Sequence, residues 1–324
     1  MKGGCFLVIM DSWNTNVRVS TKPGELHSSR SGGKPSPFGG GAKHRQTPVG
    51  IILIALAVLA CVGAVWFYSS ARSTLVELRP TDLCPKDTNR APPEIYAILI
   101  DQTDKLDPLA QQSIVNTLLA KLRSELEGPE SQEKARNALV EIWTFSNIGK
   151  NVTTVGEVRV ATERVLSMCN PGAPAEWDKL YRNVDVVRRQ HARFYASLEE
   201  TIKTSLSFPD AKESPVIEAI YAIGVQVFSR PEAIQSRKYL FIISDLLQNT
   251  QNLRMHSGRP PRYDSWIGTQ QGQRALPALS MVNVNAFVLP STQPQLQGND
   301  FAQFWMSLFK GAGAATPVRL DRVR

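Results

Sequence analysis

The stretch Glu94–Lys105 reads EIYAILIDQTDK, and it decides the fold. An unbroken apolar run from Ala97 to Ile100 ends abruptly on Asp101, and only polar residues follow it. Such a run is typical of a strand that is buried on both faces of a parallel sheet. In open α/β sheets, ligand sites lie at the carboxyl ends of the strands. We therefore expect a central strand here and a binding site at its end.

Further runs repeat this pattern along the chain. Lys238–Asp245 reads KYLFIISD and also passes from apolar residues through a small residue to Asp. Strands are predicted at 138–145 and 282–289, with shorter ones at 152–160, expected to be an antiparallel edge strand, and 317–320. Helices are predicted at 108–126, 175–206, 214–227 and 300–310 from their apolar spacing. This alternation predicts an α/β fold: a three-layer, mostly parallel sheet with helices on both faces.

Residues 49–68 form an uncharged apolar run ending in Trp66, Phe67 and Tyr68. A helix of that length crosses a hydrocarbon core of about 30 Å. The alternative is a cleaved signal peptide, but the run is long for one and begins far from the N-terminus. We expect one transmembrane helix at 49–69, with the N-terminus cytoplasmic and the remainder periplasmic, in a bacterial inner membrane.

The other segments follow from composition and charge. Residues 1–48 contain seven Lys and Arg against two acidic residues, with many Gly, Ser and Pro, which predicts a disordered basic cytoplasmic tail whose start codon is either Met1 or Met10. Residues 70–92 form a Pro-containing spacer, and 93–324 form the α/β domain. The formal charge of +8 is concentrated in the tail, so we expect no nucleic-acid partner.

The four cysteines divide according to this topology. Cys5 lies in the tail and Cys61 in the apolar run, while Cys84 and Cys169 both lie in the part expected outside the cytoplasm. Because disulfides persist in an oxidising envelope, we predict a Cys84–Cys169 disulfide. The alternative is two unpaired thiols. No CxxC motif or histidine cluster indicates a zinc site.

Polar side chains follow the two Asp-terminated strands and begin one helix. Neighbouring parallel strands would bring Asp101, Thr103, Ser214 and Asp245 to one edge of the sheet. Carboxylates and hydroxyls are the hard oxygen ligands that Mg²⁺ or Ca²⁺ prefers. Each residue also has a purely structural interpretation, since Ser214 before Pro215 is a good helix N-cap.

From about residue 93 to 322, the order of elements and these residues resemble the von Willebrand factor A domain. That family has a metal-ion-dependent adhesion site made from Asp-x-Ser-x-Ser, a later Thr and a later Asp. The resemblance implies that Asp101 and Thr103 fill the first two motif positions, with Ser214 at the Thr position and Asp245 at the final Asp. Lys105 stands at the third motif position, and Asp104 is an additional carboxylate. In the family, such a metal binds a carboxylate of a protein partner.

Two alternatives remain open. Phosphatases of the haloacid dehalogenase type also place an Asp after a central strand, but they need a second Asp as general acid where this chain has Thr103. The domain could instead be a structural part of an envelope assembly that has lost its metal, with Lys105 as the sign of that loss. No Ser-His-Asp elbow or glycine-rich phosphate loop is visible, so we expect a protein-binding or scaffolding module rather than an enzyme.

Overall fold

The structure of the chain is a computed structural model. It describes residues 48–73, 77–87, 91–103, 106, 108–127, 136–147, 149, 151–174, 183–206, 213–256 and 260–323. The chain divides into two compact units, Met1–Ala60 and Cys61–Arg324. The described part of the first unit is the beginning of helix α1 (Pro48–Ser73), whose apolar side chains are largely exposed, as at Leu59 and Val65.

Among the described residues, no helix has the combination of length and apolarity that crossing a bilayer requires. A helix does form over 49–69, but its role as a membrane span stays a prediction. The tail predicted at 1–48 lies outside the described residues except for Pro48, which begins α1.

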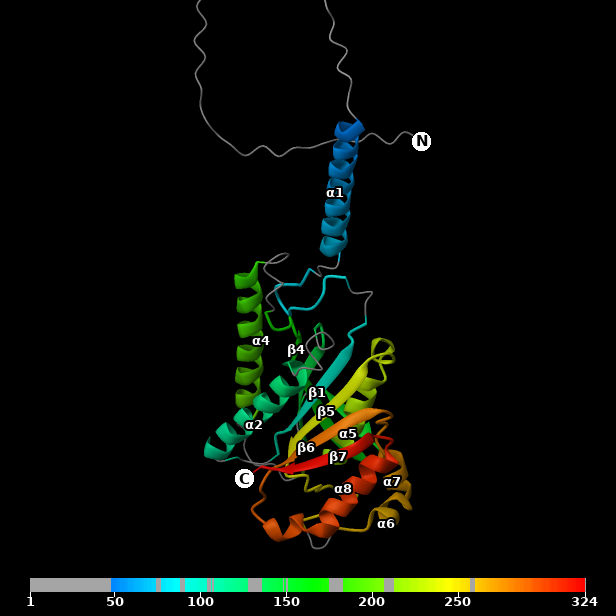
Figure 1. Ribbon diagram of the computed structural model, residues 1–324. Helices are drawn as coiled ribbons and strands as arrows, with labels where there is room; N and C mark the ends of the chain where they lie inside the picture. Colours follow the sequence, from blue (N-terminus) through cyan, green and yellow to red (C-terminus); the bar gives the residue numbers. More distant parts are fainter. Residues whose placement is uncertain are drawn as a thin grey trace, which may run out of the picture. The chain divides into compact units, whose positions relative to one another are not determined.

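The second unit is built on a seven-stranded sheet (Figure 1) in the order β3-β4-β2-β1-β5-β6-β7. Its strands are β1 (Glu94–Asp101), β2 (Leu139–Ser146), β3 (Val152–Val155), β4 (Val158–Cys169), β5 (Arg237–Ser244), β6 (Val282–Val288) and β7 (Ala315–Arg322). The pairings of β1 with β2, β1 with β5, β5 with β6 and β6 with β7 are parallel. The two pairings of β4, with β2 and with β3, are antiparallel. The predicted α/β fold with a mostly parallel sheet is thus confirmed.

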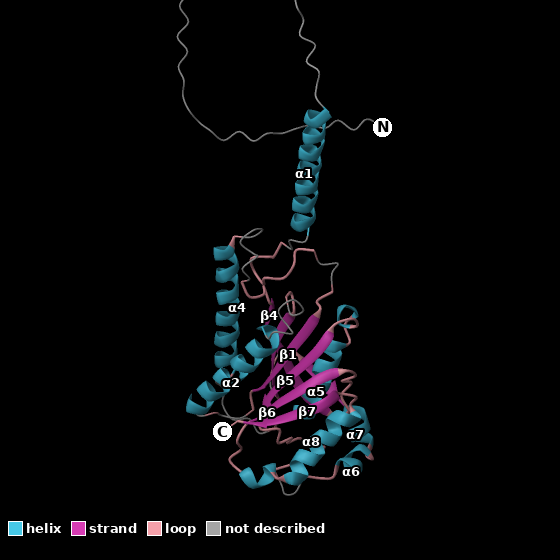
Figure 2. Cartoon of the chain, in the orientation of Figure 1, coloured by secondary structure: helices cyan, strands magenta, loops and turns pink. Residues whose placement is uncertain are grey.

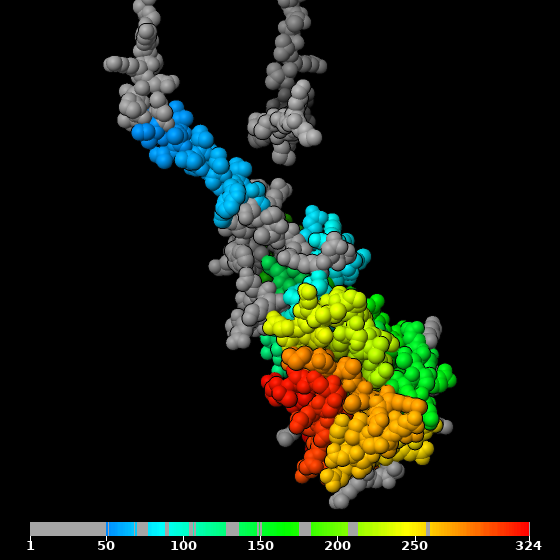
Figure 3. All heavy atoms as spheres, turned by 90° about the vertical axis from the view of Figure 1, so that its right-hand side faces the viewer, coloured from blue at the N-terminus to red at the C-terminus, as the bar shows by residue number. Residues whose placement is uncertain are grey.

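Helices cover the sheet on both sides (Figure 2). They are α2 (Pro108–Glu127), α4 (Val184–Ser205), α5 (Val216–Ile223), α6 (Tyr263–Ile267), α7 (Gln270–Ala275) and α8 (Asn299–Gly311). Helices α2 and α4 pack on one face, whereas α5 and α8 contribute to the core on the other. Helices α7 and α8 and strand β7 gather on the face seen in Figure 3, in orange to red.

Strand β1 explains why the sheet needs both helical layers. All eight of its residues are buried. Ile95, Ala97 and Leu99 belong to the core with α5 and α8. Tyr96 and Ile98, on the alternate positions, belong to the core with α2 and α4. Because successive side chains of a strand point to opposite faces, an apolar run without alternation fits only a sheet that is covered by helices on both faces.

Several elements differ from their predicted bounds. The short strand predicted at 152–160 is a hairpin, in which β4 continues to Cys169 along β2. Polar residues at many positions of β4 hide it from a search for apolar runs, because part of its surface is exposed. The long helix predicted from residue 175 is described from Val184 onward, and residues 175–182 lie outside the described part. The helix predicted at 214–227 ends as α5 at Ile223 and continues as a π-helical turn, Gly224–Phe228.

The predicted disulfide is confirmed. Cys84 and Cys169 are joined by a 2.04 Å S–S bond, with Cα atoms 4.7 Å apart. The bond joins the segment before the sheet to the end of β4, where the Cys169 N–H also donates to the Asp82 carbonyl at 2.9 Å. Cys61 is a free, exposed cysteine. The residues that precede β1 are thereby attached to the sheet edge on which β3 and β4 lie.

Candidate functional site

Asp101 is the last residue of β1, and its carboxylate is the centre of a buried polar cluster. Oδ1 accepts hydrogen bonds from the Thr103 amide at 2.9 Å and from Thr103 Oγ1 at 2.6 Å. Oδ2 accepts from Ser244 Oγ at 2.6 Å and, more weakly, from Ser214 Oγ at 3.4 Å. Thr103 Oγ1 and Ser214 Oγ are 3.0 Å apart. The side chains of the cluster are almost fully buried, which makes each of these hydrogen bonds costly to lose.

The sheet topology explains why these residues meet. Strand β1 lies between β2 and β5, and its register with β5 pairs Ile100 with Ile243. Asp101 and Ser244 are the next residues on each strand, so the two side chains lie next to each other at the carboxyl ends. The chain passes to opposite sides of β1 to form β2 and β5, so this is the switch point of the sheet. Open α/β sheets place ligands at such points.

Ser214 is brought to the cluster by a backbone bridge. Its amide donates to the Asn249 carbonyl at 3.0 Å, and the Asn249 amide donates back to the Ser214 carbonyl at 2.9 Å. The N-capping interpretation of Ser214 does not describe its contacts, because α5 has Pro215 at its N-cap and no side-chain cap there. Ser214 instead contacts the Asp101 and Thr103 side chains.

Asp245 follows Ser244 and so lies beside the cluster. Its Oδ1 accepts a hydrogen bond from the Leu247 amide at 2.8 Å, and its carbonyl accepts one from Gln297 at 2.9 Å. Hydrogen bonds therefore join Asp101, Thr103 and Ser214. Asp245 lies beside this cluster, one residue after Ser244. Asp104 and Lys105, the remaining two residues of the predicted site, lie outside the described residues.

Sequence reasoning missed Ser244. This side chain has no exposed surface, donates to Asp101 and accepts from the Leu246 amide at 2.9 Å. The signal was the small residue before Asp in KYLFIISD, but only the strand register shows that it lies opposite Asp101.

A second polar group, also missed, supports the loops around the cluster. Gln248 accepts a hydrogen bond from the Ile217 amide at 2.9 Å and donates to Glu218 Oε2 at 2.8 Å and to Thr250 Oγ1 at 3.2 Å. Burial of Glu218 in the apolar core raises the pKa of its carboxyl to about 7, although the hydrogen bond from Gln248 opposes this shift. Gln248 thus joins the first turn of α5 to the loop that follows β5.

The donor atoms of the cluster fit a hard cation. One carboxylate and three hydroxyls offer the oxygen ligands that Mg²⁺ and Ca²⁺ take. The described residues contain no group of three or more His, Cys, Asp or Glu positioned for a metal. Because affinity for these ions rises with the number of charged ligands, a site centred on Asp101 would bind them weakly.

The phosphatase alternative finds no support in this geometry. It needs a carboxylic acid two residues after Asp101, and the Thr103 hydroxyl at that position donates to Asp101 itself.

Comparison with known proteins gives no family for the chain. No protein-family model matches it, and no curated protein matches it. Solved structures that are similar to it include the following two. Human COPII-coat protein Sec24c is 13% identical with a TM-score of 0.31, and the match covers 73% of this chain and 30% of that one. An aerotolerance-related membrane protein from Bacteroides fragilis, crystallised with multiple mutations to serine, is 11% identical with a TM-score of 0.32, covering 71% and 92%.

Proposed function

We propose that the chain is a membrane-tethered, von Willebrand factor A-like module that binds or scaffolds a protein partner on the periplasmic side. The observation that carries the proposal is the hydroxyl-rich cluster around Asp101 at the switch point of the sheet. The cluster would hold Mg²⁺ or Ca²⁺ through Asp101, Thr103 and Ser214, with Asp245 beside them. A bound cation would supply an electrophilic site for a carboxylate of the partner.

Titration calorimetry on the purified full chain tests the metal step. With MgCl₂ or CaCl₂ we expect weak binding, with a dissociation constant on the order of 1 mM. Asp101→Asn should abolish it, whereas Asp185→Asn, at an exposed position of α4, should not. Equal binding by both variants would contradict the assignment of the site.

A metal-free scaffold is the second candidate, and one observation favours it. The Asp101 carboxylate already accepts hydrogen bonds from one backbone amide and three hydroxyls of the protein. Donors of this kind stabilise a buried carboxylate without a cation. If wild-type protein takes up no cation in the calorimeter, this candidate replaces the first. A pull-down from an envelope extract, with and without EDTA, would then show partners that EDTA does not release.

The proposed location rests on the sequence and on two structural features. Residues 49–68 carry no charge, and the described side chains of α1 from Ile52 to Phe67 are apolar and exposed. The Cys84–Cys169 disulfide supports an oxidising compartment for the residues that follow.

Native protein should stay with membranes after an alkaline carbonate wash. A Leu56→Arg/Leu59→Arg variant should be released, and Leu109→Arg, at an exposed leucine of α2, should be retained.

A further inference from the structure

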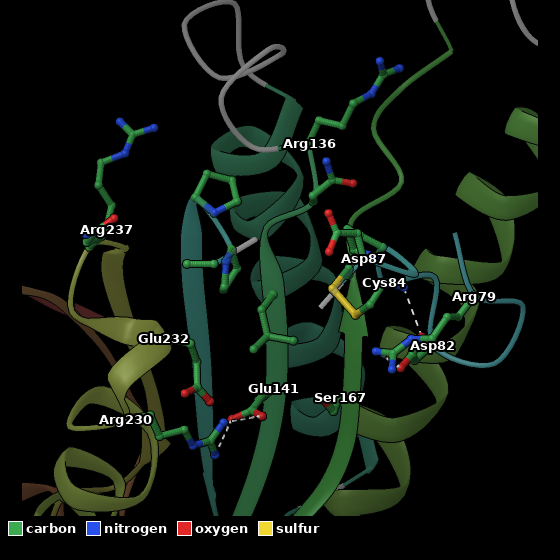
Figure 4. A pocket seen from close by; sticks show the side chains of 18 of the residues that line it. Arg79, Asp82, Cys84, Asp87, Arg136, Glu141, Ser167, Arg230, Glu232 and Arg237 are labelled. Carbon is green, nitrogen blue, oxygen red and sulfur yellow. Dashed lines mark hydrogen bonds and ion pairs between the residues drawn. A yellow bond between two sulfur atoms is a disulfide. The ribbon is translucent and has the colours of Figure 1, made fainter. Parts of the chain in front are cut away.

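A hollow of about 1020 Å³ lies at the other end of the sheet from Asp101 (Figure 4). Pro93, Leu139 and Arg237, at the beginnings of β1, β2 and β5, line it together with the Cys84–Cys169 disulfide. The disulfide attaches the segment 78–87 beside this hollow, so the wall on that side is covalently fixed to β4.

Two guanidinium groups meet on one buried carboxylate in this hollow. Glu141 is 1% exposed, and Arg230 contacts it with two nitrogens, Nη1 to Oε1 at 3.0 Å and Nη2 to Oε2 at 3.2 Å. Arg164 Nη1 donates to the same Oε1 at 2.9 Å, and Trp143 Nε1 donates to Oε2 at 3.2 Å. Figure 4 shows Arg230 reaching Glu141 from the side of β5. One buried carboxylate thus pairs with two guanidinium groups, which leaves one positive charge in excess at this point of the hollow.

Arg164 is the group best placed to use this surplus. Its side chain is 47% exposed, and in the described part of the chain it reaches Glu141 through Nη1 alone. A guanidinium has five N–H donors in a planar fork that matches a carboxylate or a phosphate. A ligand anion on Arg164 would continue the alternation of charges that begins with Arg230 and Glu141.

The other lining residues distinguish between classes of anion. The hollow also contains Arg79, paired with Asp82, and Arg237, paired with the buried Glu94. Asp87 and Glu232 line it as well, and these carboxylates oppose a ligand that concentrates several charges on a few neighbouring atoms, such as a polyphosphate. The lining is also partly apolar, with Pro85, Pro92, Pro93 and Leu139. Its volume reaches the upper end of the range for small-molecule sites, about 1,000 Å³.

We propose that this hollow binds an acidic peptide segment of a partner protein, with a peptide carboxylate on Arg164 and apolar peptide atoms on the prolines. This site is separate from the Asp101 cluster and involves no metal. The proposal therefore stands or falls independently of cation binding at the other end of the sheet.

Fluorescence anisotropy on the full chain tests the proposal. The probe is a fluorescein-labelled oligoglutamate peptide, and an oligoglutamine peptide of equal length is its uncharged control. Because a charge-assisted hydrogen bond is worth about one decade of affinity or more, Arg164→Gln should weaken binding about tenfold. Arg159→Gln removes the same charge from an exposed position of the same strand, outside the hollow, and should change the affinity less than about twofold. Arg164→Lys should lie between them, because an ammonium keeps the charge but loses the fork.

The outcomes are decisive in either direction. Binding of oligoglutamate alone, unchanged by EDTA and sensitive to Arg164 but not to Arg159, supports the proposal. Equal loss in both glutamine variants would mean diffuse attraction, and the absence of wild-type binding would mean no site; either result overturns it. Stronger competition by inorganic phosphate than by glutarate would also overturn it in favour of a phosphate site. Thermal unfolding checks that Arg164→Gln is folded, and Arg164→Lys carries the test if it is not.

Discussion

At the scale of single residues, Ser244 holds the candidate site together. Its hydroxyl donates to Asp101 and accepts from the Leu246 amide, so it joins the end of β5 both to β1 and to the loop that follows. A hydroxyl with two partners and no exposed surface is hard to replace, because removing it leaves a buried amide without an acceptor.

Ser244→Ala should therefore reduce the free energy of unfolding by about 1–3 kcal/mol. Ser280→Ala, at an exposed serine before β6, should change it by less than about 0.5 kcal/mol. Urea unfolding of both variants measures the difference. Equal values would show that the buried hydroxyl contributes no more than a surface one.

Glu218 should make the stability of the protein depend on pH. Its pKa is about 7 in the folded chain against an ordinary value of 4.5, so the folded state holds the proton more tightly than the unfolded state. The free energy of unfolding should then fall as the pH rises from about 4.5 through about 7. Glu218→Gln should be more stable than wild type by up to about 3 kcal/mol at pH 8 and nearly equal to it at pH 4.5.

Denaturant unfolding of wild type and Glu218→Gln at these two pH values is the measurement. Gln keeps an oxygen that can accept from Gln248, so the variant isolates the charge. A difference that does not change with pH would show that burial does not perturb this carboxyl.

At the scale of elements, the pairing of α6 with α7 depends on a glycine. A Cβ at Gly272 would lie 2.2 Å from the backbone oxygen of Trp266, and backbone cannot move aside as a flexible side chain can. Trp266 in turn packs on Phe304 of α8, with ring centroids 5.7 Å apart. Displacement of α6 would therefore reach the core under α8.

Gly272→Ala should lower the free energy of unfolding by about 1–3 kcal/mol through this overpacking. Gly298→Ala is the matched control, because its Cβ would meet nothing nearer than the Gln295 oxygen at 3.8 Å. Thermal unfolding of the two alanine variants makes the comparison. A larger loss at Gly298 than at Gly272 would contradict the prediction.

Sequence could predict elements where burial is uniform. Strands β1, β5 and β6 lie within one residue of their predicted bounds, because most of their residues are buried and apolar. Strand β4 was predicted too short, since its partly exposed face carries Arg159 and Glu163 among the apolar positions.

Part of the site could also be predicted: Asp101, Thr103 and Ser214 were expected to meet, and they do. Ser244 and Glu218 were missed because their roles depend on the register of β5 and on the packing of α5. No local sequence pattern contains that information.

At the scale of the whole molecule, the disulfide closes a loop with a sequence separation of 85 residues that contains β1, α2, β2, β3 and β4. Closing such a loop restricts the unfolded chain, which in the chain-entropy description is worth about 4.6 kcal/mol. A Cys84→Ser/Cys169→Ser variant should lose about this much free energy of unfolding. Cys61→Ser, at the free cysteine, should lose almost nothing. Unfolding under non-reducing conditions measures both variants, and a wild type that reducing agent does not destabilise would contradict the prediction.

The same covalent bond decides how the protein responds to mechanical load. A pull on the chain before Cys84 passes through sulfur directly to Cys169, so the residues between them bear no tension. When the chain is unfolded by stretching it from its two ends, the residues inside this loop should not extend. The gain in contour length should therefore be shorter by about 300 Å, from 85 residues at about 3.5 Å each. For a domain tethered at its amino-terminal side, the strand that ends in Asp101 would be among the four strands that a pulling force cannot extend.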